Sequence, residues 1–378
     1  MASVALAVAG GGGAALVAAR HDGDASGRAA RAGAVEAQPI PAPGGEPAPP
    51  APPPNTPSPE TVATTIAPEP AAPVPLPLAG CPPPPRTGPR AAPTQWRPSV
   101  LVPEAELPAP LLPSAWVGDV SPLTGKGMWV WKYRQTEQGD PDAIVARAVS
   151  AGLRHLWVRV GDSRDGFYGA EVLAGLVPRA HAAGLAVVGW GFPYLWDPVG
   201  DARWSAEALA WRGPDGSVLD AFSPDIETAS ENVRLSEVRV RVYLGLVREA
   251  ATTNSRRPVV ATVYPPTEAR MAIYPYEAIA AYVDAFAPMV YWGCTEPGKA
   301  ATEALDRLSA LRPVHLIGQA FDMVETGGRA APPTAAETTR FLDVARRRGA
   351  VGASFWVWQS IGAEQWSALA DYPWSPTA

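Results

Sequence analysis

The sequence has little of several residue types that mark common classes of protein. It contains only two cysteines and four histidines in 378 residues, and charged residues make up 18% of the chain. Two cysteines are too few for a disulfide framework, a zinc ribbon or an iron–sulfur site, and no histidine lies near another. We therefore expect neither a metal site nor another cofactor. Because the net charge is −6 and no basic block occurs, we expect no nucleic-acid partner either.

Proline, by contrast, is abundant but concentrated in one region. Of the 45 prolines, 27 fall between Pro39 and Pro113. Such a segment lacks the apolar side chains that would offset the entropy of ordering it, and it favours extended polyproline II structure. We therefore predict a signal peptide or membrane anchor over 1–20, a disordered Pro/Ala-rich linker over 21–114, and one folded domain over 115–378.

The first residues of the chain suggest export. Met1 to Ala19 carry no charge and are mostly small and apolar. This is typical of a secretory signal or of a weak membrane anchor, and the alternative is a disordered Ala/Gly tail. We predict an extracellular or cell-envelope location, with the N-terminal segment as the point of membrane attachment if it is retained. Cys81 follows a short acylation-like box, but it lies deep in the chain, so we interpret it as an unpaired linker cysteine and Cys294 as structural.

From Gly127 onward, short apolar runs alternate with amphipathic segments rich in Ala, Arg and Glu. The predicted strands are 128–132, 153–160, 186–192, 219–227, 258–264, 283–292, 314–321 and 352–358. The predicted helices lie near 141–151, 170–183, 203–211, 234–252, 275–281, 299–311, 335–348 and 363–370. Gly152, Gly184 and Gly349 stand where helix C-caps are expected, each just before a strand.

Eight strand–helix units in about 250 residues predict an α/β fold of the (β/α)₈ barrel type, also called a TIM barrel. The rival fold, an open doubly wound sheet, is typically marked by a glycine-rich phosphate loop after the first strand. Here that strand is followed by Lys132-Tyr133-Arg134-Gln135, which is no such loop. We expect a monomer whose active site lies at the carboxyl ends of the strands.

The fourth predicted strand ends in Asp225-Ile226-Glu227. Residues i and i+2 of a strand point to the same face, so both carboxyl groups can enter the barrel mouth. Two close carboxyl groups do not both ionise easily, and one is expected to stay protonated near neutral pH. Such a pair supplies the acid and the charged partner that cleavage of a glycosidic bond needs. Two solvated acids at the start of a loop are the alternative, and Asp162 and Asp165 are other candidate acids.

Aromatic side chains gather at the predicted strand ends. Thirteen of the 14 tryptophans lie from Trp116 onward. Aromatic faces bind the C–H faces of sugar rings, whereas amides, hydroxyls and charged groups bind sugar hydroxyls. The predicted substrate-binding residues are Arg159, Trp190, Tyr264, Tyr291, Gln319, Trp356 and Trp358. Core packing of the tryptophans and a rim ion pair for Arg159 are the alternatives. His155 and His315 lie in mid-strand, so we interpret them as core residues.

Two short motifs resemble known enzymes. The stretch Asp220–Glu227 looks like the fourth-strand D-x-E signature of family 25 glycoside hydrolases, the muramidase-type lysozyme barrels. The closing Trp356–Gln359 is similar to the end of their last strand. Chitinase-like barrels, whose longer acidic motif also ends in D-x-E, are the looser resemblance. The likeness implies that Glu227 is the general acid and that Asp225 assists at the N-acetyl group of the sugar.

The sequence therefore predicts a secreted or membrane-tethered glycoside hydrolase-like protein whose partner is a polysaccharide, with cell-wall glycan as the favoured substrate. The competing hypothesis is a barrel that binds carbohydrate or associates with the wall without catalysis. It is motivated by the first strand, because family 25 barrels carry an Asp at its end, where this chain has Val130-Trp131-Lys132.

Overall fold

The computed structural model describes residues 80–81, 98–324 and 328–374. The predicted leader over 1–20 and most of the predicted linker lie outside the described residues, and both stay predictions. No helix in the described part of the chain is long and apolar enough to cross a membrane.

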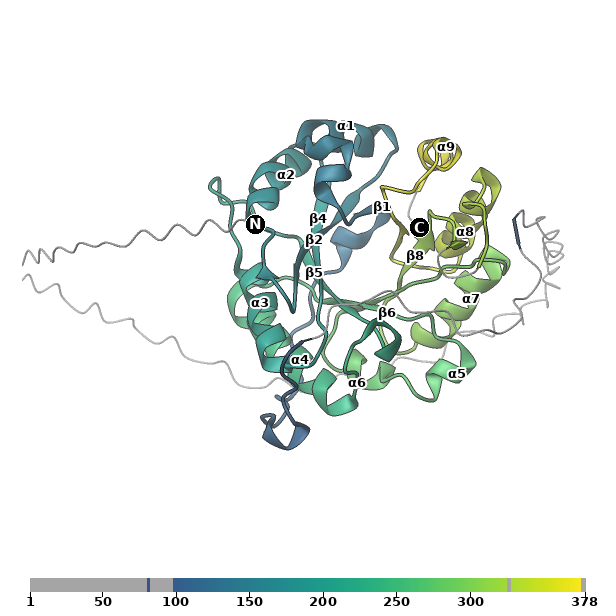
Figure 1. Ribbon diagram of the computed structural model, residues 1–378. Coiled ribbons are helices and arrows are strands. Elements are labelled where there is room, and N and C mark those ends of the chain that lie inside the picture. The colour runs from purple at the N-terminus through teal and green to yellow at the C-terminus, as the bar shows by residue number, and fades with distance from the viewer. Residues whose placement is uncertain (1–79, 82–97, 325–327, 375–378) are drawn as a thin grey trace, which may run out of the picture. The chain divides into compact units, whose positions relative to one another are not determined.

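Strands of the described residues form one sheet that closes into a ring (Figure 1). They are β1 (Gly125–Val130), β2 (His155–Asp162), β3 (Gly166–Phe167), β4 (Ala186–Phe192), β5 (Ala221–Ile226), β6 (Val260–Val263), β7 (Ala285–Pro288), β8 (His315–Gln319) and β9 (Gly352–Trp356). The short β3 pairs antiparallel with β2 as a hairpin, and the other eight run parallel in the order β7-β6-β5-β4-β2-β1-β9-β8.

Backbone bridges between the two ends of that order close the barrel. Phe286 pairs with Val314, and Met289 pairs with Ile317, so the segments of β7 and β8 lie side by side. The predicted α/β barrel of eight parallel strands is therefore confirmed. The fourth strand of the ring is β5, because the β3 hairpin precedes it in the chain.

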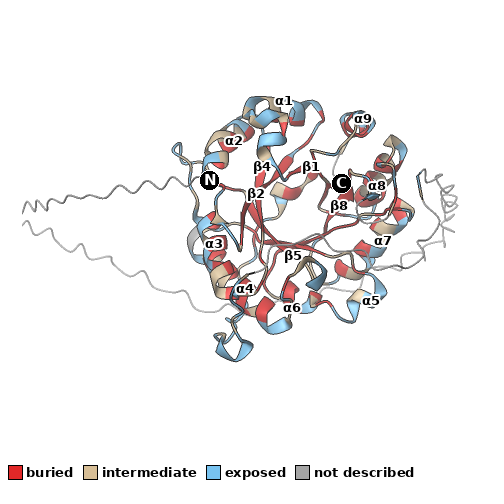
Figure 2. Ribbon diagram, in the orientation of Figure 1, coloured by how far each residue is buried: buried red, intermediate tan, exposed pale blue. Residues whose placement is uncertain are grey.

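Helices cover the outside of the ring, and their buried faces turn toward the strands (Figure 2). They are α1 (Pro141–Ser150), α2 (Ala170–Ala182), α3 (Pro198–Ala210), α4 (Glu237–Ala250), α5 (Glu268–Met271), α6 (Tyr276–Ala280), α7 (Pro297–Leu308), α8 (Ala335–Arg347) and α9 (Ala363–Asp371). Gly152, Gly184 and Gly349 have φ of +62°, +72° and +75°, the left-handed conformation that ends a helix. The glycine pattern in the sequence therefore marked three real helix ends.

The two faces of each strand pack into different layers of core, one inside the ring and one between the strands and the helices. In β5, Ala221 packs in the inner cluster with Trp129 and Trp190, whereas Phe222 and Ile226 pack in the outer cluster beneath the helices. Side chains alternate along a strand, so the odd-numbered positions of β5 face the barrel interior. This alternation places Asp225 on the inner face.

Part of the segment predicted as linker contacts the barrel. The backbone N–H of Val102 donates to the carbonyl of Trp196 at 3.0 Å, and the Tyr282 hydroxyl donates to the carbonyl of Leu111 at 2.9 Å. Arg239 of α4 also donates to the Val102 carbonyl. The chain is therefore attached to the barrel before residue 115, where we place the start of the folded domain.

A disulfide joins Cys81 to Cys294 across 213 residues of sequence. The interpretation of Cys81 as an unpaired linker cysteine is therefore wrong, and Cys294 is structural as predicted. The same short segment is held a second time, because the Ala330 N–H donates to the Gly80 carbonyl at 2.9 Å. Stable disulfides are typical of proteins outside the reducing cytosol, which points to an extracellular location.

Candidate active site

The candidate pair lies where β5 ends at the barrel mouth. Asp225 is the penultimate residue of β5, and Glu227 follows the last. Between them, Ile226 points outward into the core, and its carbonyl accepts a hydrogen bond of 2.6 Å from the Tyr274 hydroxyl. This bond fixes the strand end from outside. Asp225 is 6% exposed and Glu227 is half-buried.

Burial changes the acidity of both carboxyl groups. It raises the pKa of Asp225 to about 7, an effect that Arg159 opposes and the charge of Glu231 increases. Burial, followed by the charge of Asp225, raises the pKa of Glu227 well above its ordinary range. The Oδ1 atom of Asp225 is buried and has no hydrogen-bond partner among the described residues. An acid that is poorly hydrogen-bonded and shielded from water holds its proton more tightly.

Two tyrosines from neighbouring strands face the pair. Tyr264, which follows β6, hydrogen-bonds Glu227 and thereby moderates the rise in the pKa of that carboxyl. Tyr291, which follows β7, is half-buried, and burial and then the charges of Asp225 and Glu227 raise its pKa well above its usual range. Both hydroxyls therefore stay protonated and can donate hydrogen bonds. The structure brings together these two predicted residues and the predicted acids.

Arg159 reaches the same region from β2. Its guanidinium donates to the Asp162 carboxylate at 2.9 Å and lies over the ring of Trp190, with 5.2 Å from the guanidinium carbon to the ring centroid. Its positive charge lowers the pKa of Asp225. Arg159 is thus both a partner in an ion pair and a charge that favours ionised Asp225.

Three of the predicted substrate-binding residues have little or no free surface. Trp190 is 1% exposed and packs in the inner cluster with Trp129. Trp358 packs in the outer cluster, 4.9 Å from the ring of Trp366, and its Nε1 donates to Glu137. Gln319 is fully buried: its Oε1 accepts from the Gly293 N–H and its Nε2 donates to the Phe321 carbonyl.

These three side chains therefore pack the core and support the barrel in this structure, and they present almost no surface to a sugar. Trp356 is half-buried at the end of β9 and lines a cavity at the mouth, so it stays a predicted substrate-binding residue.

Trp131 is the residue that the predicted site omits. It is 40% exposed and directly follows β1, and its ring lies 5.9 Å from that of Trp356. It lines two cavities of about 520 Å³ each, one beside Arg159 and one beside Trp356. The signal was present in the sequence, because Trp131 has the same parity along its strand as the inward-facing Trp129.

Two groups of residues have structural roles. His155 and His315 are fully buried and hydrogen-bonded to Trp157 and Ser354 respectively, so their interpretation as core residues is confirmed. Asp162, an alternative acid, accepts hydrogen bonds from two backbone N–H groups and from Arg159.

The described residues contain no group of three or more His, Cys, Asp or Glu side chains placed to hold a metal.

Comparisons with known proteins identify the architecture. No known family model and no curated protein matches the sequence. Among solved structures, the C-terminal domain of a provisionally assigned chitinase from Desulfitobacterium hafniense DCB-2 matches with a TM-score of 0.50 and 11% identity over 65% of this chain and 98% of that one. A chitinase from Chromobacterium violaceum ATCC 12472 matches with a TM-score of 0.50 and 10% identity over the same shares.

An endo-β-1,4-mannanase from Thermotoga petrophila matches with a TM-score of 0.46 and 12% identity over 62% of this chain and 68% of that one. The two chitinases share a barrel fold with this chain, and neither is a muramidase-type lysozyme. The comparison therefore supports a barrel fold that occurs in glycoside hydrolases and does not single out family 25. At such identities the comparison shows the fold alone.

Proposed function

We propose that this protein hydrolyses glycosidic bonds in a polysaccharide, with Glu227 as general acid and Asp225 as its partner. The observation that carries the proposal is that two acids stand two residues apart at the end of β5, Asp225 on the inner face of the strand and Glu227 directly after it, and that burial raises the pKa of each. Glycoside hydrolysis needs one carboxyl group that is protonated near neutral pH and a second that can become charged.

Each side chain then has a defined task. Glu227 donates its proton to the leaving glycosidic oxygen, and Asp225, with its negative charge favoured by Arg159, stabilises positive charge at the sugar carbon or orients its N-acetyl group. Tyr264 hydrogen-bonds Glu227 and orients it. Tyr291 is placed to donate to the substrate, and Trp356 offers an aromatic surface at the mouth.

We further propose that the substrate is an extracellular glycan built from amino sugars, with cell-wall glycan as the first candidate. The disulfide supports a location outside the cytosol, and the uncharged run from Met1 to Ala19 fits an export signal. The resemblance of Asp220–Glu227 to the D-x-E stretch of family 25 enzymes suggests peptidoglycan, and the structural likeness to two chitinases suggests polymers of amino sugars. A monomer attached to the envelope through 1–20 remains part of this proposal.

The test compares the full chain with Glu227→Gln in assays of peptidoglycan and chitin-oligosaccharide hydrolysis. We expect the variant to lose a factor of about 10² to 10⁴ in turnover, because it cannot protonate the leaving oxygen. Glu171→Gln, the same change at an exposed position on α2, is the matched control and should leave turnover unchanged. Equal rates for wild type and Glu227→Gln would remove Glu227 from the mechanism.

Two observations favour a second candidate, a barrel that binds glycans without cleaving them. No acid stands at the end of β1, where the chain reads Val130-Trp131-Lys132, and Asp225 is nearly inaccessible. This candidate predicts that glycan binding survives Glu227→Gln and weakens in Trp131→Ala, and that wild type shows no turnover.

A further inference from the structure

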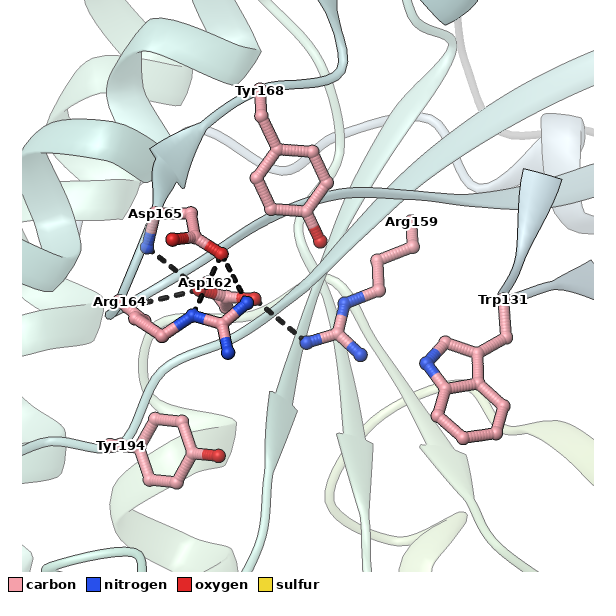
Figure 3. Close-up of a pocket in the computed structure, with 7 residues that line it drawn as sticks. All are labelled: Trp131, Arg159, Asp162, Arg164, Asp165, Tyr168 and Tyr194. Carbon is pink, nitrogen blue, oxygen red and sulfur yellow. Dashed lines mark hydrogen bonds and ion pairs between the residues drawn. The ribbon is translucent and has the colours of Figure 1, made fainter. Parts of the chain in front are cut away.

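A charged cavity of about 520 Å³ lies over β2 and the β3 hairpin, and Arg159, whose charge acts on Asp225, is one of the residues that line it. It is lined by Trp131, Arg159, Asp162, Arg164, Asp165, Tyr168 and Tyr194. Figure 3 shows the guanidinium groups of Arg159 and Arg164 and the hydroxyls of Tyr168 and Tyr194 converging on one space. The proposed hydrolase mechanism assigns this cavity no substrate group.

Asp162, the more deeply buried acid of the cavity, already accepts hydrogen bonds on both carboxylate oxygens. Asp162 is 5% exposed, and its Oδ1 accepts from the backbone N–H groups of Arg164 and Asp165, both at 2.9 Å. Its Oδ2 accepts from Arg159 at 2.9 Å. The Asp162 carboxylate thus fixes the turn after β2 and holds Arg159 in position. It offers little further acceptor capacity to a ligand.

The N–H donors of the two arginines in the cavity are not all engaged in hydrogen bonds that the structure shows. Arg159 has five N–H donors; it is hydrogen-bonded to Asp162 and to Tyr168, and its buried Nε has no partner among the described residues. Arg164 is bonded through Nε and one terminal nitrogen to a single oxygen of Asp165, and both of these side chains are about half exposed. The Asp165 carboxylate also lines the cavity but is half exposed and bonded to Arg164, so the remaining hydrogen-bonding capacity of the cavity lies mainly in the N–H groups of the two arginines.

We propose that this cavity is a subsite for an acidic sugar unit, whose carboxylate accepts hydrogen bonds from Arg159 and Arg164. The assignment rests on the proposed function, because it names the kind of glycan that the same mouth binds. A sugar hydroxyl donates as well as accepts, whereas a carboxylate only accepts, so a cavity with spare donors favours the carboxylate. Charge-assisted bonds from guanidinium groups are also about twice as strong as neutral ones.

The position of Arg159 connects this subsite to the proposed acids. Its charge already acts on Asp225, and its guanidinium is held over Trp190. A carboxylate bound at Arg159 partly neutralises that charge, and the pKa of Asp225 then rises. Binding of an acidic unit is thereby linked to the protonation state of Asp225.

The test measures binding to the full chain in the absence of turnover, using Glu227→Gln as background. The probes are a hyaluronan tetrasaccharide, which contains glucuronate and N-acetylglucosamine, and chitotetraose, a neutral oligomer of the same length. Calorimetry should show at least tenfold tighter binding of the acidic probe at low salt, and this preference should shrink as salt is raised, since the cavity is partly open to water.

Variants identify the groups responsible. Arg159→Met and the more exposed Arg164→Gln should each weaken binding of the acidic probe about tenfold and leave binding of chitotetraose nearly unchanged. Arg179→Gln is the matched control, because Arg179 pairs with Asp142 on the helical surface much as Arg164 pairs with Asp165. It should change neither affinity.

Equal affinities for the two probes, no binding of the acidic probe, or a preference that survives Arg164→Gln would overturn the inference. Failure of the proposed function gives a different result. In that case Glu227→Gln matches wild type in hydrolysis assays, while the charge preference, which is read from binding alone, is still measured.

Discussion

Titratable groups are buried at both ends of the barrel, but burial lowers the pKa values of histidines at one end and raises those of carboxyl groups at the other. We call His155, Trp157, His315 and Ser354 the barrel floor, since both histidines begin their strands. Burial lowers the pKa of His155 to about 3, and burial together with His155 lowers the pKa of His315 well below its usual range. Near pH 7 both rings are neutral and serve as packing and hydrogen-bonding groups.

At the mouth, the same loss of water acts on acids. Burial raises the pKa of Asp225 to about 7 and raises that of Glu227 well above its ordinary range. Burial moves every titratable group toward its neutral form, which takes the titration of the two histidines away from physiological pH and brings that of Asp225 close to it. The comparison teaches that burial makes the floor histidines inert and makes the mouth carboxyl groups available for proton transfer.

The largest expected effect on stability lies at the floor. Trp157 is fully buried, stacks on Trp129 with 4.6 Å between ring centroids, and donates to His155 at 3.0 Å. Trp157→Ala should therefore destabilise the protein by about 3–5 kcal/mol, as measured by urea unfolding. Trp131→Ala at the mouth should cost about 1 kcal/mol or less, because that ring is 40% exposed. Similar losses for the two variants would contradict the division between a packed floor and an open mouth.

The disulfide should have the next largest effect. Cys294 lies in the β7–α7 connection, close after Tyr291, so the bond ties the mouth rim to an earlier part of the chain. Replacing both cysteines by serine should destabilise the protein by about 2–4 kcal/mol, because the unfolded chain is no longer cross-linked.

Reductant provides the control for this effect. It should lower the melting temperature of wild type to that of the double variant and leave the variant itself unchanged. A wild type that is insensitive to reductant after the bond has been shown to be broken would mean that packing alone holds the rim.

The barrel could be predicted from the sequence because its signals are local. The predicted strand runs are mostly apolar and five to ten residues long, and glycines such as Gly152 and Gly349 end the helices before them. Each signal reflects the conformational preference or burial of a few neighbouring residues. The placement of Asp225 on the inner face of its strand follows from the same kind of local rule, the alternation of side chains.

Other features depend on contacts between distant segments. Trp356 and Trp358 are both aromatic and close to a strand end, yet one lines the mouth and the other packs beneath α9, because the alternation of the strand does not continue past its end. The partner of Cys81 lies 213 residues away. The charged cavity forms because the turn after β2 folds over Arg159, and no local sequence pattern predicts this fold of the turn.

The smallest of these stability effects tests the mouth most directly. Between the ordinary aspartate pKa of about 4 and its folded value of about 7, the folded protein holds a proton on Asp225 that the unfolded chain has lost, so stability falls as pH rises through this window. Asp225→Asn cannot ionise, and it should stabilise the protein by about 1–3 kcal/mol at pH 8 and by nothing at pH 4.

At the floor the sign is reversed. Burial lowers the pKa of His155 from 6.5 to about 3, so between these pH values His155 is protonated in the unfolded chain but neutral in the folded protein. Stability therefore falls as pH falls through this window. His155→Gln should therefore remove part of the acid-side loss and leave the alkaline side unchanged. The measurement is the urea midpoint of wild type and both variants from pH 4 to 8. If the two variants flatten the same side of the profile, then burial does not act oppositely on the two ends of the barrel, and the acids at the mouth are not held in the protonated form.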